Sequence, residues 1–128
     1  MMLPITATFI ALLALLQVPM TFAVGLARIP NTVHFYDEGD IKLRRRQRAH
    51  ANFTENAPIF LLALAAAELS GGNTALLWSL GAVFVLGRLL HYAVLLIQGW
   101  GNGRAFGMVL TLAPIAVLAV TTLVNLNT

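Results

Sequence analysis

The chain contains no cysteine and few charged residues, and each shortage excludes a class of protein. Without cysteine there can be no disulfide bond, no thiolate metal ligand and no cysteine nucleophile, so any thiol chemistry requires a bound thiol. Charged residues make up only 10% of the 128 residues, whereas hydrophobic residues make up 59%. A soluble domain carries roughly 25% charged residues, so this composition indicates an integral membrane protein.

The few charges present are mostly basic and give a formal net charge of +3. A basic balance can indicate nucleic-acid binding, but here the cations cluster beside apolar segments, which favours a position at a membrane surface. The cluster consists of Lys42, Arg44, Arg45, Arg46 and Arg48.

Four segments, at residues 4–28, 44–69, 74–98 and 103–126, are predicted to cross the membrane as helices. The first is longer than the apolar region of a signal peptide, and no positive residue precedes it, so it is interpreted as a mature span. The second is mainly apolar, apart from Glu68, only over residues 57–69, which is too short to cross alone. Its helix must therefore begin earlier, near Arg44. The fold prediction is an all-α, four-helix membrane bundle forming a single domain over residues 1–128.

The connections at residues 70–73 and 99–103 are short, which makes the last three helices antiparallel neighbours. Asn73 or Thr74 can cap the third helix. Every Lys and Arg except Arg88 lies in or beside the loops that follow the first and third spans. The positive-inside rule predicts that these two loops are cytoplasmic.

Polar residues enter the second span as a stripe. Arg48, Asn52 and Glu55 stand at positions i, i+4 and i+7, which share one face of a helix. Such groups are costly in hydrocarbon, so they normally face a bundle interior or a wet cavity and mark a functional site. One set of four helices cannot enclose so many polar groups, which favours oligomerisation.

The third span carries a second polar group. Arg88 and His91 are three residues apart on one helix face, and Tyr92 follows them. Two interpretations stay open: a structural ion pair between Arg88 and Glu55, or a site for an anion or zwitterion between the second and third helices.

Other polar residues also have two interpretations. Arg104 opens the fourth helix, where it could extend to the interface or stabilise a developing anion, and Arg28 has the same two options. Glu68 is expected to reach water at the far end of its helix, and His50 to be solvated or interfacial. The histidines show no metal-ligand spacing, so no metal is predicted.

These motifs together resemble the MAPEG family, the membrane-associated proteins in eicosanoid and glutathione metabolism. The likeness covers nearly the whole chain and depends on three features: Arg48-x-x-x-Asn52-x-x-Glu55 with Pro58 one turn on, Gly87-Arg88-x-x-His91, and Arg104 at the head of the fourth helix. The cysteine-free composition and the short turns suggest a small bacterial member, in the inner membrane.

The resemblance implies a homotrimer that binds glutathione as co-substrate between neighbouring subunits, toward the cytosolic side. It implies that Arg104 stabilises the glutathione thiolate. The residues it implies for glutathione binding are Arg28, Arg48, Asn52, Glu55, Asn56, Arg88, His91 and Tyr92. A guanidinium beside a thiol lowers the thiol pKa from its usual value of about 8.5, which raises the thiolate fraction at neutral pH.

Three positions depart from the family pattern, and Leu95 departs from that of the members that form eicosanoids. Leu95 stands where those members have a tyrosine, Ala105 replaces a hydroxyl residue after the catalytic arginine, and Asn56 replaces a tyrosine. The expected function is therefore glutathione transfer to hydrophobic electrophiles, or reduction of lipid hydroperoxides. The alternative is a non-catalytic membrane protein of the same fold that binds lipid or acts as a scaffold.

Overall fold

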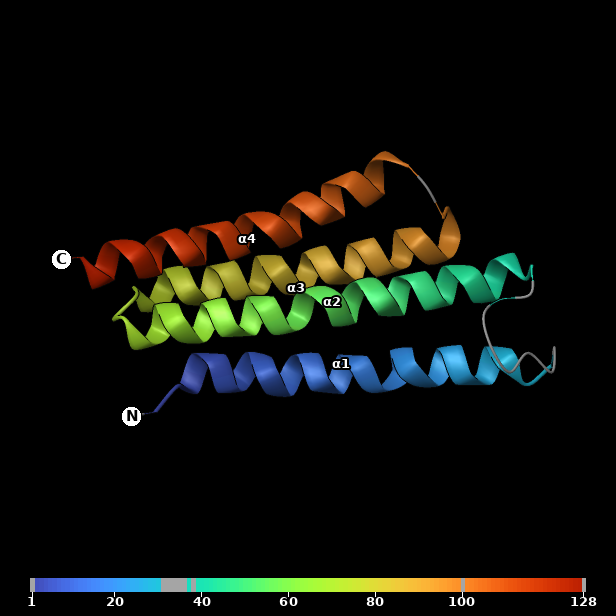
Figure 1. Ribbon diagram of the computed structural model, residues 1–128, viewed down its shortest axis with the longest axis horizontal. Coiled ribbons are helices and arrows are strands. Elements are labelled where there is room, and N and C mark those ends of the chain that lie inside the picture. Colours follow the sequence, from blue (N-terminus) through green and yellow to red (C-terminus); the bar gives the residue numbers. More distant parts are fainter. Residues whose placement is uncertain (1, 31–36, 38, 100, 128) are drawn as a thin grey trace.

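The computed structural model describes residues 2–30, 37, 39–99 and 101–127. Four helices account for most of them: α1 (Pro4–Arg28), α2 (Ile41–Leu69), α3 (Thr74–Ile97) and α4 (Asn102–Leu126). They lie lengthwise side by side, with α2 and α3 between α1 and α4 (Figure 1). The prediction of an all-α fold with four helices is confirmed.

The basic segments that follow α1 and α3 lie at the same end of the bundle, which we call the basic end (Figure 1). Helices α1 and α3 end there and helices α2 and α4 begin there, whereas α1 begins and α4 ends at the opposite end, with the α2–α3 turn (Figure 1). Among the described helices, α1, α3 and α4 are long and apolar enough to cross a membrane. Helix α2 is the longest, but its first half carries the basic cluster and the polar stripe.

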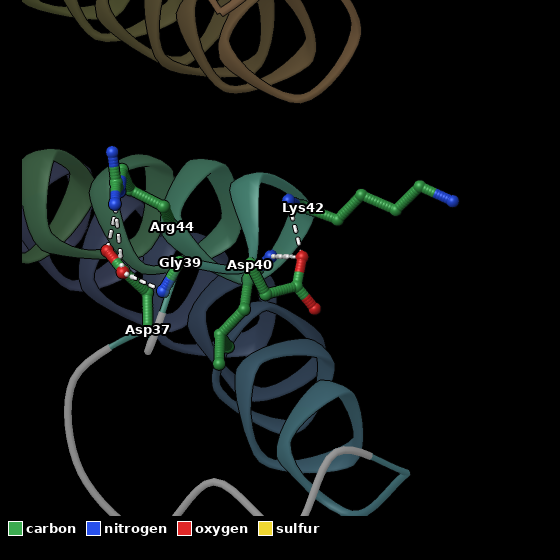
Figure 2. A network of polar contacts seen from close by, with 6 residues as sticks. Asp37, Gly39, Asp40, Lys42 and Arg44 are labelled. Carbon is green, nitrogen blue, oxygen red and sulfur yellow. Dashed lines mark hydrogen bonds and ion pairs between the residues drawn. The ribbon is translucent and has the colours of Figure 1, made fainter.

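Helix α2 begins at Ile41, three residues before the predicted start, because Asp40 caps it. The Asp40 carboxylate accepts hydrogen bonds from the backbone N–H groups of Lys42 and Leu43, at 2.8 and 3.2 Å (Figure 2). An aspartate in this position satisfies N–H groups that have no partner inside the helix. The predicted cap of α3 is confirmed at Asn73, whose side chain accepts from the N–H of Leu76.

A stripe on α2 forms the centre of the bundle, because α2 packs against all three other helices. Its buried residues recur every three or four positions from Ala49 onward, as one helix face requires, and Leu43 lies six positions before Ala49. They are Leu43, Ala49, Phe53, Ala57, Phe60, Leu64 and Ala67. Aromatic side chains connect this core to α1 and α3. Phe60 stacks on Phe84 of α3 with ring centroids 3.8 Å apart, and it packs edge-on against Phe9 of α1.

The outer surface is apolar over most of the helix length. Large exposed side chains occur on every helix, including Leu15, Phe22, Leu62, Leu86 and Val120. A continuous apolar exterior of this kind fits lipid rather than water.

Glu68 clamps the start of α1 rather than reaching water. Its carboxylate accepts hydrogen bonds from the backbone N–H of Ile5 at 3.0 Å and of Thr6 at 2.8 Å, and from the Thr6 hydroxyl at 2.7 Å. Helix α1 has no side-chain cap of its own, since Leu3 precedes it. The carboxylate also interacts favourably with the positive end of the helix dipole.

Glu68→Gln should therefore lower the free energy of unfolding by about 1 kcal/mol, because an amide offers one acceptor oxygen where the carboxylate offers two. Unfolding in detergent, followed by circular dichroism, measures the change. Thr6→Val and the double variant, which combines Thr6→Val with Glu68→Gln, complete the comparison. Additive losses for Thr6→Val and Glu68→Gln would contradict a shared clamp.

Candidate functional site

The basic end of the bundle contains a groove of about 350 Å³ between α2, α3 and α4. Four of its described lining residues are arginines, and none is acidic. The full lining is Ile41, Arg44, Arg45, Arg48, Leu95, Gly99 and Arg104; we call it the arginine groove. Guanidinium groups gathered in this way repel one another, so the groove favours an anionic occupant.

The basic cluster divides among several partners because successive residues of a helix point about 100° apart. Arg45 donates to the carbonyl of Ile97 at 3.1 Å and so caps the end of α3. Arg46 donates to the carbonyl of Ala23 on α1 at 3.3 Å. Arg48 is exposed and has no partner among the described residues, so its charge is available at the groove.

Arg44 joins the groove to the preceding loop. Its Nε donates to the Asp37 carboxylate at 2.6 Å, and its Nη2 to the second oxygen at 3.0 Å (Figure 2). The N–H of Gly39 donates to the same carboxylate at 2.9 Å. The Arg44 guanidinium, with this N–H, lowers the Asp37 pKa from 3.8 to about 2. Asp37 is thus an anion at neutral pH, and its pair with Arg44 joins Asp37 to α2.

Arg104 is the third residue of α4, at the mouth of the bundle. It lines the arginine groove and also a second groove of about 370 Å³ on the outer side of α4, together with Ala105 and Met108. The N-terminus of α4 adds its own positive potential at this point. An anion placed beside Arg104 would therefore meet both a guanidinium and the helix dipole.

A second polar group lies deeper, about 14 Å along the helices from this end. Arg88 of α3 donates through Nη1 to the side-chain oxygen of Asn52 on α2, and through Nη2 to the Thr111 hydroxyl on α4. Its Nη2 also lies 3.4 Å from the carbonyl oxygen of Gly107. Arg88 thus joins three helices, and we call Asn52, Arg88 and Thr111 the buried bridge.

Arg88 has no ion pair with Glu55 among the described residues. Glu55 is exposed on the outside of α2, about 21 Å along that helix from Ile41, and Arg88 is bonded elsewhere. The structural ion pair expected as one option is therefore replaced by neutral hydrogen-bond acceptors. Asn56 points its amide back to the Asn52 carbonyl, at 2.8 Å.

His91 lies between Arg104, at the arginine groove, and the buried bridge. Its Nδ1 is 3.2 Å from the carbonyl oxygen of Arg104. A carbonyl only accepts, so Nδ1 carries the proton and donates. His91 is buried and Tyr92 half-buried. Arg28 is half-buried at the end of α1, outside the arginine groove.

The structure thus separates the residues assigned to glutathione. Arg48 and Arg104 share the arginine groove, whereas Asn52, Arg88 and His91 turn toward the interior. The sequence interpretation missed Arg44 and Arg45 at the groove, and Thr111 in the buried bridge. Arg45, Arg48 and Asn52 follow the i, i+3, i+7 spacing of one helix face, which could have indicated Arg45. Thr111 had no such signal in an apolar helix.

His50, expected to be solvated or interfacial, is half-buried and contacts α1 at an exposed position. Its Nε2 lies 2.9 Å from the hydroxyl of Thr21. This contact and the Arg46–Ala23 bond join α1 to α2 near the basic end. Among the described residues, no group of His, Asp and Glu could hold a metal ion.

Comparison with known proteins identifies a family and two relatives. The profile of the MAPEG family matches residues 6–124. Two curated proteins of this kind, each called inner membrane protein YecN, come from Escherichia coli K12 and Escherichia coli O6:H1. Each is 32% identical to this chain over 88 residues, which cover 69% of this chain and 67% of the relative.

Proposed function

Because this chain belongs to the MAPEG family, we propose that it is a membrane transferase that binds glutathione and activates its thiol. The observation that carries the proposal is the arginine groove, where four guanidinium groups meet and the Asp37 carboxylate pairs with one of them, Arg44. Glutathione has two carboxylates, and arginine is the side chain best suited to bind carboxylates in a bidentate manner.

Arg104 is the catalytic residue in this proposal. Its guanidinium and the N-terminus of α4 favour the thiolate over the thiol, so more of the bound glutathione is reactive at neutral pH. The thiolate sulfur attacks an electrophilic carbon and forms a C–S bond, while the leaving group departs with its electron pair. With a lipid hydroperoxide, the sulfur attacks an oxygen, the O–O bond breaks, and a sulfenic acid and an alcohol form; a second glutathione then gives the disulfide and water.

The binding site requires more than one subunit in this proposal. Arg48 and Glu55 are exposed at about 10 and 21 Å along α2, and neither has a partner among the described residues. Unpaired charges at that depth are costly against lipid, so a neighbouring copy would cover them, and Glu55 would accept the glutathione ammonium. We take the assembly to be a homotrimer, in the inner membrane, with the basic end cytoplasmic.

A second function, non-catalytic lipid binding or scaffolding, is favoured by two observations. The outer faces of α1 and α4 carry apolar grooves of about 310 and 390 Å³, each lined by one helix. Ala105 beside Arg104 also offers no hydroxyl to assist a thiolate.

Binding of glutathione and of its diethyl ester to the purified protein in detergent distinguishes charge recognition from apolar binding. Glutathione should bind, and the ester at least about 10-fold more weakly, because esterification removes both carboxylate charges. Equal binding of the two would remove the arginine groove as the recognition element. Titration calorimetry provides the measurement, and Arg48→Gln should weaken glutathione while leaving the ester unchanged.

A further inference from the structure

The turn that carries Arg104 is poorly secured by α4 itself. Gly101 occupies the cap position with a φ of 149°, and no side chain caps the helix. The first N–H groups of a helix have no partners inside it, so an uncapped first turn frays readily. The N–H of Arg104 bonds within this turn to the carbonyl of Gly101, at 3.0 Å. Contacts with another helix secure the turn further.

Helix α3 supplies the nearest of these contacts. His91 donates to the carbonyl of Arg104 itself, at 3.2 Å. Two glycines of α4 permit the approach: a Cβ on Gly107 would lie 2.9 Å from the His91 Cβ, and one on Gly103 would lie 3.1 Å from Val94. The small-xxx-small spacing of these glycines is typical of helices that pack closely in membranes.

The buried bridge supplies the second contact. Thr111 accepts from Arg88 and donates its own proton to the carbonyl of Gly107, at 2.8 Å. Gly107 is one turn after Arg104, and Thr111 is one turn further on the same face. The bridge thus fixes the rotation of α4 against α2 and α3 immediately behind the turn that carries Arg104.

The burial of these groups argues against contact with a ligand in the groove. Arg88, His91 and Thr111 are only 2%, 1% and 0% exposed. None of them lines either groove that contains Arg104. Arg88 and His91 hydrogen-bond to neighbouring helices, and Thr111 bonds both to Arg88 and within α4. The Arg88 Nε and the His91 Nε2 are buried without a hydrogen-bond partner among the described residues.

We propose that Thr111 is a positioning residue, which acts through Arg88 and the α4 backbone to hold Arg104 in register with bound thiol. This inference rests on the proposed function, and it assigns Arg88 and His91 to the same positioning role rather than to ligand binding. A displaced catalytic group loses rate without loss of substrate affinity, because ligand binding depends on the other arginines.

Thr111→Val tests the inference, since valine keeps the shape of threonine and removes only the hydroxyl. The variant should lower kcat about 10-fold, raise the pKa of the bound glutathione thiol and leave the glutathione KM within about twofold. Thr111→Ser restores the hydroxyl and should recover most of the rate. Thr122→Val is the matched control, because Thr122 makes the same bond to a carbonyl four residues back without an arginine.

A second readout tests positioning without glutathione. Amide hydrogen exchange in unliganded protein should become faster over residues 102–108 in Thr111→Val and stay unchanged in Thr122→Val. If wild-type protein forms no thiolate, the proposed function fails and this exchange result alone decides the inference. Equal exchange in the two variants, unchanged thiol pKa, or a raised KM at constant kcat would each overturn it.

Discussion

Arg104→Gln should lower kcat with glutathione and a hydrophobic electrophile by at least about 100-fold, the typical cost of removing one group that stabilises a developing anion. Glutamine keeps hydrogen-bonding capacity but has no charge, so the bound thiol returns toward its usual pKa near 8.5. Affinity for glutathione should fall much less, because three further arginines line the groove. Stopped-flow and steady-state kinetics on purified protein measure both quantities.

Lys42→Gln is the charge-matched control for Arg104→Gln. Lys42 is exposed near the same end of the bundle but does not line the groove, and its side chain extends away from its neighbours (Figure 2). Its loss should leave kcat unchanged. Equal losses of kcat from Lys42→Gln and Arg104→Gln would indicate that the overall positive potential of the basic end, and not Arg104 specifically, supports the reaction.

Gly87→Val should destabilise the subunit by about 3 kcal/mol, the upper part of the range for overpacking. A Cβ at Gly87 would lie 2.7 Å from the Leu110 Cβ and 3.0 Å from its backbone carbon, and backbone cannot move aside as a flexible side chain can. Helices α3 and α4 would separate at the level of Arg88, so activity should fall with stability. Unfolding in detergent, monitored by circular dichroism, gives the loss.

Gly25→Val is the matched control for Gly87→Val. A Cβ at Gly25 would meet no atom within 4 Å, so its substitution should change stability by less than about 0.5 kcal/mol. A loss at Gly87 no greater than at Gly25 would mean that close approach of α3 and α4 is not needed for the fold.

The elements of the fold follow from the sequence because their signals are local. Long apolar runs, short turns and the Asn73 cap predict helices whose ends the structure places within three residues. The earlier start of α2 also had a local signal, since aspartate before a helix is a preferred cap and Asp40 occupies that position.

The partners of the polar residues could not be predicted, because they depend on how the helices rotate against one another. Arg88 and Glu55 have opposite charges, yet Arg88 bonds to Asn52 and Thr111 while Glu55 lies outside. Glu68 binds the start of α1, more than sixty positions away in the chain. Helical spacing identifies which residues share a face, but not which helix that face meets.

Central to this account is the claim that Arg104 and its groove convert glutathione to a thiolate. The most direct test is a thiolate difference spectrum of the purified protein titrated with glutathione at neutral pH, beside Arg104→Gln. The account predicts thiolate absorbance that saturates in the wild type and is absent in the variant, although the variant still binds glutathione. Glutathione binding without thiolate in the wild type would contradict it and would favour the non-catalytic protein.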